Sequence, residues 1–244
     1  MFSFFKKKDA HVAINYEPIW VDMHSHVLPG IDDGARNVED SIVLIDKMME
    51  LGIKKIIATP HIMADYYKNT AETINNSLEI LKAELKERNI DIEIEAAAEH
   101  YYDETFDARI NDHKLMTMGD NYVLFEFSFI SMPPNAVGAI LRMKELGYKP
   151  ILAHPERYPY MDIEQLRNMR DWGCMLQINT ISLTGYFGKD AKKMAESLVD
   201  NELVDFISSD MHHLKHAEAF KTALKLPHVI KLLSNYPLKN IMLK

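Results

Sequence analysis

The side chains best suited to bind metal ions lie at or near the ends of short apolar runs in this chain. The first run leads into VDMHSHVLPGIDDGA (residues 21–35), which contains His24, His26, Asp32 and Asp33. Later runs supply further candidates: His61 in ATPH, Glu99 in AAAEH, Glu126 in LFEFS, His154 in LAHP, and Asp210 and His212 in SSDMH. Mixed imidazole and carboxylate ligands suit Mn, Fe or Zn. More than four ligands imply more than one ion, and adjacent ions can activate a water and hold a phosphoryl oxygen.

Each candidate also has a plainer explanation. A lone His after a strand is more often a capping or hydrogen-bonded residue than a ligand, and Asp32 and Asp33 could be turn residues before Gly34. Glu126 and Asp210 are harder to explain this way, because a carboxylate buried in an apolar run needs a cation or a strong donor. The whole set favours a metal cluster. The remaining histidines of the folded part are expected at the surface or behind the ligands: His100, His113, His213, His216 and His228.

The candidates follow a regular alternation of apolar runs and helix-like segments. Strands are predicted at 19–24, 54–61, 90–100, 121–128, 149–158, 174–180 and 203–213, and helices at 38–52, 70–89, 134–147, 163–173 and 189–201. Such alternation implies parallel strands joined by right-handed crossovers. Seven strands predict a (β/α) barrel, one strand short of eight, and an open doubly wound sheet is the alternative. In a barrel, all strand ends open on one face, so the candidates would converge there.

Composition narrows the class of protein. The 244 residues are 47% apolar and carry a net charge of −8, which predicts a folded core and argues against general nucleic-acid binding. A single Cys excludes a disulfide framework and suggests a reducing, cytoplasmic location. No linker rich in Pro, Gly or Ser divides the chain, so we expect one domain over residues 19–244.

The N-terminal segment, residues 1–18, is predicted to be a flexible tail. It lacks the apolar stretch of a signal peptide, and no run in the chain reaches the roughly 20 apolar residues of a membrane span. Its Phe and Lys residues (MFSFFKKK) could touch an anionic membrane. Three lysines are few for stable anchoring, so none is expected.

Six blocks of sequence resemble those of the PHP (polymerase and histidinol phosphatase) superfamily. They are, in order, DMHSHVLPGIDDGA, ATPH, AAAEHY, LFEFS, LAHPERY and SSDMHH. More closely, they resemble the bacterial capsule or exopolysaccharide-type protein-tyrosine phosphatases, the CpsB/YwqE-like family. The resemblance covers about residues 20–215. It implies a distorted (β/α)7 TIM-like barrel with a trinuclear site that prefers manganese (Mn²⁺).

The resemblance also implies which residues hold each ion. The three groups are His24, His26, Glu99 and Asp210; Glu99, Glu126 and His154; and Asp33, His61 and His212. Asp33 and His61, with Arg157, are the predicted catalytic residues. Asp32 would support a ligand or form the turn, and Asp22 would orient a ligand.

Arg157 in HPERY matches the family's phosphate-contacting arginine. A guanidinium group suits a pair of phosphate oxygens, and a surface salt bridge is the plainer alternative. After SDMH the family commonly carries an Arg a few residues on, whereas this chain reads HLKHAEAF, with Lys215 or His216 as the only nearby bases. Substrate contacts on that side therefore differ from the family pattern.

The leading functional hypothesis is a metal-dependent phosphatase acting on phosphotyrosine in proteins. By resemblance, its partner would be a bacterial tyrosine kinase that governs polysaccharide export. One alternative is a small-molecule phosphatase of the histidinol-phosphatase type. Another is a non-catalytic regulatory module, which the full set of predicted ligands disfavours.

Two further predictions concern the reacting groups. Cys174 is not expected to be a nucleophile, because a C-x5-R phosphate loop would need Arg where the chain has Thr180. Tyr101, Tyr102 and Phe106 could line an aromatic slot for the substrate, or they could simply pack in the core.

Overall fold

Short parallel strands carry the predicted ligands. The computed structural model describes residues 15–244. Its strands are β1 (Val21–Asp22), β2 (Lys55–Ala58), β3 (His61–Ile62), β4 (Glu93–Ala96), β5 (Glu99–Tyr101), β6 (Tyr122–Glu126), β7 (Lys149–Ala153), β8 (Met175–Asn179) and β9 (Phe206–Ser208). They form two sheets, ordered β1-β2-β4 and β3-β5-β6-β7-β8-β9, in which every neighbouring pair is parallel.

Two of the predicted strands are each divided into two pieces. The segment 54–61 contains β2 and the start of β3, separated by Thr59 and Pro60. The segment 90–100 contains all of β4 and the first two residues of β5. Pro60 has no amide hydrogen to donate to a ladder, which accounts for the first break. The backbone remains paired across the gap, because the amide of Ala97 donates to the carbonyl of Ala58 at 2.8 Å and that of Glu99 to Pro60 at 3.1 Å.

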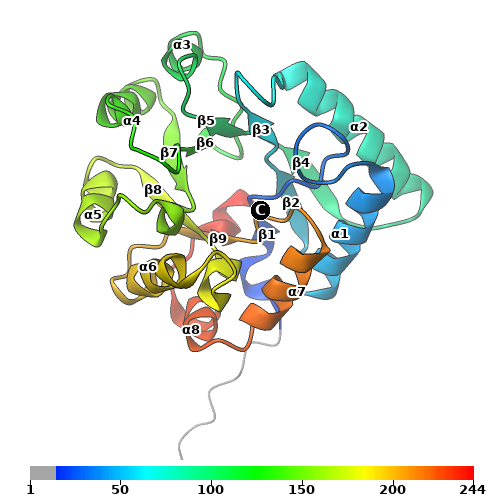
Figure 1. The fold of residues 1–244 in the computed structure, drawn as a ribbon. Helices are drawn as coiled ribbons and strands as arrows, with labels where there is room; N and C mark the ends of the chain where they lie inside the picture. The colour runs from blue at the N-terminus through cyan, green and yellow to red at the C-terminus, as the bar shows by residue number, and fades with distance from the viewer. Residues whose placement is uncertain (1–14) are drawn as a thin grey trace, which may run out of the picture.

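The two sheets close into a barrel where the last strand meets the first. Ser25 and Met211 form a parallel bridge. The amide of His26 donates to the carbonyl of Met211, and the amide of Asp210 donates to that of His24, both at 2.9 Å. With β2–β3 and β4–β5 each counted as one strand, seven strands surround the centre (Figure 1). The predicted seven-stranded barrel is therefore confirmed, and the open doubly wound sheet is wrong.

Helices form the outer layer of the barrel (Figure 1). They are α1 (Val38–Glu50), α2 (Ala71–Glu87), α3 (Phe106–Asn111), α4 (Ala136–Glu145), α5 (Ile163–Asp171), α6 (Lys189–Asp200), α7 (Leu214–Ala223) and α8 (Pro227–Asn235), with short 3-10 turns η1 (Glu17–Ile19), η2 (Pro155–Arg157), η3 (Thr180–Thr184) and η4 (Asn240–Leu243). The five predicted helices are confirmed as α1, α2, α4, α5 and α6. The short α3 and the C-terminal α7 and α8 were not predicted.

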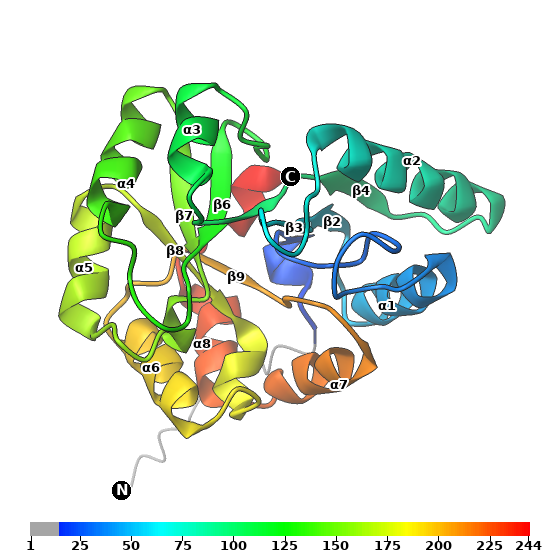
Figure 2. The same ribbon diagram turned by 45° about the horizontal axis from the view of Figure 1, so that its top comes forward.

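Helix α1 shows how the outer layer is attached. The Asn37 side chain caps its first turn by accepting the amide of Asp40 at 2.9 Å. Gly52 follows its end with φ of +97°, a backbone conformation that favours glycine. The helix buries residues such as Ile45 against the barrel and leaves Val43 on its outer side. Figure 2 shows α1 beside α7, although the two are far apart in the sequence.

The end of the predicted tail belongs to the folded part. Tyr16 is fully buried, its ring stacks on that of Phe220 with centroids 3.8 Å apart, and its hydroxyl donates to the Phe220 carbonyl at 2.7 Å. For residues 15–18 the prediction of a flexible segment is therefore wrong. Residues 1–14, including the Phe and Lys cluster, lie outside the described residues. No helix within residues 15–244 combines the length and apolar composition that a membrane crossing requires.

Candidate metal centre

The nine predicted ligands gather in one cluster at the carboxyl ends of the strands, and seven of them line a cavity there. Their potential ligand atoms fall into four groups, and within each group all atoms lie within 4.8 Å of one another. The groups are His26, Asp33, His61 and His212; His24, Glu99 and His154; His24, His26 and Asp210; and His61, Glu99 and Glu126. Residues separated by most of the chain are therefore brought to one place, as the barrel topology predicts.

Glu99 lies at the centre of this cluster. Its Oε2 is 3.2 Å from His24 Nε2, 3.5 Å from His26 Nε2 and 3.1 Å from His61 Nδ1. Its Oε1 lies 2.9 Å from His154 Nε2. Because its oxygens face several imidazoles, Glu99 would hold metal ions together with more than one of these histidines.

Asp210 forms a second point of convergence. Its Oδ1 lies 3.3 Å from His24 Nε2 and 3.4 Å from both His26 Nε2 and His212 Nδ1. Asp210 and His154 both have left-handed backbone conformations, with φ of +51° and +34°. Non-glycine residues adopt this conformation rarely, and such strain concentrates at functional sites.

Asp33 completes the outer side of the cluster. Its Oδ1 is 3.5 Å from Nε2 of both His61 and His212, and its side chain is 51% exposed. The ring of His26 stacks on that of His212 with centroids 3.9 Å apart. His26 therefore lies as close to this group as to Asp210, although the family resemblance implied only the latter.

Glu126 also has a different neighbour from the one implied. Its Oε1 is 3.1 Å from His61 Nδ1, whereas its Oε2 is 3.7 Å from His154 Nε2. The allocation of individual residues to individual ions therefore stays a prediction, while their convergence is a property of the structure.

Two hydrogen bonds behind the cluster fix the orientation of its first two imidazoles. His26 Nδ1 donates to Asp32 Oδ2 at 2.8 Å, and Asp32 Oδ1 accepts the amide of Gly34 at 3.0 Å. His24 Nδ1 donates to Gln177 Oε1 at 3.1 Å. In both imidazoles the Nε2 lone pair then faces the cluster, which is the arrangement that a metal ligand needs. Asp32 thus supports a ligand and forms the turn, as predicted.

The sequence analysis missed a buried amide network on β8. Gln177 Nε2 donates to Asn179 Oδ1 at 2.9 Å and to Ser208 Oγ at 2.6 Å. Asn179 Nδ2 in turn donates to Asp210 Oδ2 at 2.6 Å. The signal was present in CMLQINT, because two amides at alternate positions of an apolar strand lie on one face of it.

Asp22 acts on the cluster only indirectly. Among the described residues it forms no hydrogen bond with any of the nine predicted ligands, and its carboxylate accepts hydrogen bonds from the amide of Ser209, at 2.9 Å, and from the Ser209 hydroxyl. Burial raises the pKa of Asp22 to about 6. The predicted role in orienting a ligand is therefore exerted through the residue that precedes Asp210.

The electrostatics of the cluster favour bound cations. Burial alone would lower the pKa of His61, but the carboxylates of Glu99 and Glu126 raise it to about 9. Burial would raise the pKa of Glu99, but His24 and His61 hold it well below its usual range. The carboxylates thus stay ionised and draw positive charge into a buried site.

Unsatisfied polar atoms support the same conclusion. Glu99 Oε2, His61 Nδ1 and His154 Nδ1 are buried and make no hydrogen bond of acceptable geometry with any residue from 15 to 244. Leaving such groups unpaired costs about 1–3 kcal/mol each. Imidazole nitrogens and carboxylate oxygens are suitable donors for divalent transition metals, so the residues present fit a metal centre.

The central cavity above the cluster has a volume of about 550 Å³. Arg157 on η2 lies at its edge, with its guanidinium carbon 4.6 Å from the ring centroid of Phe129 and 4.2 Å from that of Phe187. Its Nη1 is 3.4 Å from Asp210 Oδ2, and its side chain is 24% exposed. The guanidinium therefore lies between two aromatic rings beside the cluster instead of in a surface salt bridge.

The sequence also matches a family of known proteins. The family model "Capsular polysaccharide synthesis, CpsB/CapC" matches residues 20–226. The chain belongs to this family. It is 32% identical over 198 residues to the tyrosine-protein phosphatase YwqE of Bacillus subtilis (strain 168), covering 80% of this chain and 78% of YwqE.

Solved structures of the CpsB/CapC family share its fold. A crystal structure from work on YwqE of Bacillus subtilis and CpsB of Streptococcus pneumoniae, described as unique metal-dependent tyrosine phosphatases, has a TM-score of 0.81 and 30% identity, over 89% of each chain. Histidinol phosphate phosphatase of Lactococcus lactis, crystallised with Zn, L-histidinol and phosphate, has a TM-score of 0.52 and 16% identity, over 84% of this chain and 92% of its own. The second likeness concerns the fold alone.

The aromatic lining of the cavity in this CpsB/CapC member differs in part from the prediction. Tyr101 lines the cavity as expected. Phe106 is fully buried, and Tyr102 packs against the core while its hydroxyl donates to Asp107 at 3.0 Å, so core packing, the second of the two alternatives, holds for both. The other aromatic residues that line the cavity are Tyr67, Phe129 and Phe187. They lie in connecting segments without periodicity, and the sequence analysis did not single them out.

Cys174 and the remaining bases differ in their distance from the cavity. Cys174 is buried, and burial raises the pKa of its thiol far above the range of a thiolate nucleophile. His216 is buried behind the cluster and donates from Nδ1 to the Asp210 carbonyl at 2.8 Å. His100, expected at the surface or behind the ligands, is also buried, and its ring contacts Arg109. Lys215 is exposed at the start of α7.

Proposed function

We propose that this protein is a metal-dependent phosphatase that hydrolyses phosphotyrosine in proteins. The observation that carries the proposal is the convergence of nine imidazole and carboxylate residues in one cluster at the central cavity, with Arg157 at its edge. The activity named for YwqE, a relative 32% identical to this chain, supports the choice of reaction.

The nine residues would hold two or three ions, with Mn²⁺ as the favoured metal and Fe or Zn as alternatives. Their donor set of imidazoles and carboxylates, with no thiolate, is compatible with each of these metals. When bound, the ions supply positive charge to phosphoryl oxygens and lower the pKa of water.

The side chains around the cavity would position the reactants. In the reaction, the oxygen of a water forms a bond to phosphorus while the bond from phosphorus to the tyrosine oxygen breaks, which yields tyrosine and inorganic phosphate. Arg157 would hold two phosphoryl oxygens with its parallel N–H groups. Asp33 and His61 would orient the attacking water from the exposed side of the cluster.

The preference for an aryl phosphate rests on the lining of the cavity. Phe129 and Tyr67 offer aromatic faces to the phenyl ring of phosphotyrosine. Phe129 is also partly exposed, so a ring carried on a protein chain can reach it. The substrate would be a tyrosine-phosphorylated protein, most consistently a bacterial tyrosine kinase linked to polysaccharide synthesis.

The experiment compares substrates and metals in one assay. Protein stripped with a chelator should be inactive and should recover with Mn²⁺. With Mn²⁺, kcat/KM for a phosphotyrosine peptide should exceed that for histidinol phosphate by at least about tenfold, which is roughly 1.4 kcal/mol in transition-state binding. A preference for histidinol phosphate would instead indicate a small-molecule phosphatase of the histidinol-phosphatase type. Full activity without metal would reject the proposed mechanism.

A further inference from the structure

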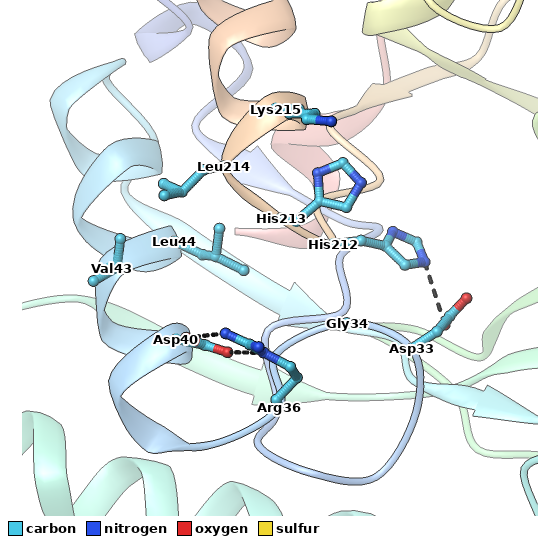
Figure 3. Close-up of a pocket in the computed structure, with 10 residues that line it drawn as sticks. All are labelled: Asp33, Gly34, Arg36, Asp40, Val43, Leu44, His212, His213, Leu214 and Lys215. Atoms are coloured by element: carbon cyan, nitrogen blue, oxygen red, sulfur yellow. Dashed lines mark hydrogen bonds and ion pairs between the residues drawn. The ribbon is translucent and has the colours of Figure 1, made fainter.

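A second hollow opens directly beside the central cavity. Its volume is about 530 Å³, and it lies between the loop at Asp33 and Gly34, helix α1 and the start of α7 (Figure 3). Asp33, His212 and His213 line both hollows. The second hollow, here called the side groove, is therefore continuous with the candidate active site.

The wall of the side groove is mainly apolar. Val43 and Leu44 come from α1, and Leu214 comes from the first turn of α7 (Figure 3). Val43 is 40% exposed and Leu214 is 51% exposed. Scattered exposed apolar side chains are ordinary. Two that come from distant parts of the chain and line one concave surface indicate a place where another molecule binds.

The charges of the groove are unequal. Arg36 is paired with Asp40, with Nε 2.7 Å from Oδ2, so these two largely cancel (Figure 3). Lys215 forms no ion pair with any of residues 15–244 and lies exposed at the groove. The carboxylate of Asp33, at the edge shared with the central cavity, lies 3.5 Å from His212. Lys215 is therefore the cation of the groove lining that has no carboxylate partner among residues 15–244.

We propose that the side groove binds the part of the substrate protein that flanks the phosphotyrosine. An apolar side chain would pack against Val43, Leu44 and Leu214, and a neighbouring carboxylate would pair with Lys215. This inference rests on the proposed phosphatase function. The two hollows are continuous, and Asp33 and His212 form the edge between them. A substrate chain whose phosphotyrosine lies in the central cavity can therefore extend over this edge into the side groove.

The reach of a peptide agrees with this placement. An extended chain advances about 3.3 Å per residue. Three residues beyond the phosphotyrosine therefore span about 10 Å, and the two hollows adjoin at Asp33, His212 and His213. A small phosphoester has no flanking residues to place in the groove.

The first test compares phosphotyrosine peptides that differ only in the three residues on either side. One peptide carries Leu and Asp there, and the other carries Ser at the same positions. With Mn²⁺-loaded protein, kcat/KM should be higher for the Leu/Asp peptide by about three- to tenfold, as expected for one partly buried apolar contact and one exposed ion pair.

Groove variants should remove this preference without affecting a small substrate. Leu214→Ser and Val43→Ser should each bring the two peptides close to equal kcat/KM and leave hydrolysis of phenyl phosphate unchanged. Leu141→Ser is the matched control, because Leu141 on α4 is also exposed, at 44%, and lies away from the groove. That variant should keep the preference for the Leu/Asp peptide.

Charge reversal tests the cation. Lys215→Glu should favour a peptide with Leu and Lys over the Leu/Asp peptide, which reverses the order seen with the unmodified protein. Both peptides are measured on the same preparation, so a general loss of activity does not affect the ratio.

The outcomes separate this inference from the proposed function. Equal kcat/KM for all peptides in the unmodified protein, with phenyl phosphate hydrolysed normally, would reject the groove and leave the phosphatase intact. Failure of the Mn²⁺-loaded protein to hydrolyse any phosphotyrosine would reject the function itself. A change of sedimentation coefficient in Leu214→Ser, with the peptide ratio kept, would show that the groove contacts a second copy of the chain and would also overturn the inference.

Discussion

The bottom and the edge of the central cavity differ in how firmly their side chains are held. We call four residues the floor: His24, Glu99, His154 and Asp210. They are all 2% exposed or less. At the rim, formed by Phe129 and Arg157, Phe129 is 41% exposed and the side chain of Arg157 is 24% exposed. The floor is fixed by buried hydrogen bonds and strained backbone, whereas Arg157 is fixed mainly by aromatic stacking.

This difference separates two tasks. A metal ligand must hold its position within a few tenths of an ångström, and a buried amide network supplies such constraint. A substrate group enters and leaves at each turnover, so the residues that contact it must remain accessible. The predictions below test whether metal binding belongs to the floor and substrate binding to the rim.

The largest effect is expected from the floor. His24→Ala or Asp210→Ala should lower kcat by about a thousandfold or more, because a cluster that acts as a unit loses most of its activity when one part is removed. The amount of Mn²⁺ retained after gel filtration should fall in parallel. Normal metal content in an inactive but folded variant would contradict the assignment of these residues as ligands.

A rim variant should lose activity without losing metal. Arg157→Ala should lower kcat/KM by about ten- to a hundredfold for phenyl phosphate and phosphotyrosine peptide alike, since charge-assisted hydrogen bonds contribute about 1.5–3 kcal/mol. The Mn²⁺ content, measured by elemental analysis, should equal that of the unmodified protein. A loss of metal in this variant would remove the distinction between floor and rim.

Replacing Gln177, which holds His24 from behind the floor, should lower metal affinity while the barrel stays folded. Gln177→Met removes the acceptor for His24 Nδ1 while keeping a similar shape. Metal affinity in a competition titration should fall by about ten- to a hundredfold, as is usual for a residue that orients a ligand. The control is circular dichroism, which should show an intact barrel, and unchanged metal affinity would mean that Gln177 does not orient His24.

The smallest effect is expected away from both regions. Cys174→Ser should keep kcat within about twofold, because the buried thiol lies outside the cavity and takes no part in transfer of the phosphoryl group. Measurement of kcat at saturating phosphotyrosine peptide gives the result. Loss of turnover in folded, metal-loaded protein would instead indicate a thiol nucleophile.

The same contrast explains what the sequence could reveal. The candidates that form the floor come at or near the ends of apolar runs, and barrel topology brings such positions together, so pattern and topology were sufficient to predict their convergence. The rim depends on connecting segments whose conformation has no periodic signal, which is why Phe129 and Phe187 were missed. For Tyr102 and Phe106 the choice between cavity and core stayed open, because an aromatic residue near a strand end fits the core as readily as a cavity.

The breaks within strands also could not be predicted from the pattern of apolar residues alone. Pro60 was visible in the sequence, but the apolar run around it continues, so the break between β2 and β3 was not predicted. The grouping of His26 with Asp33 and His212 depends on ring stacking in three dimensions. No local pattern carries that information.

Closure of the barrel between β9 and β1 has a consequence for folding during synthesis on the ribosome. His24 and His26 emerge early, whereas Asp210 and His212 are among the last predicted ligands to leave the exit tunnel. The pairing that closes the barrel, between Ser25 and Met211, joins opposite ends of the chain, and contacts of such long sequence separation slow folding. Until the last strand has been synthesised, one edge of β1 has no partner strand. Nascent chains with such unpaired edges are prone to aggregate or to bind chaperones. Metal loading is then a late event, and a full complement of ions would report that translation and folding have both been completed.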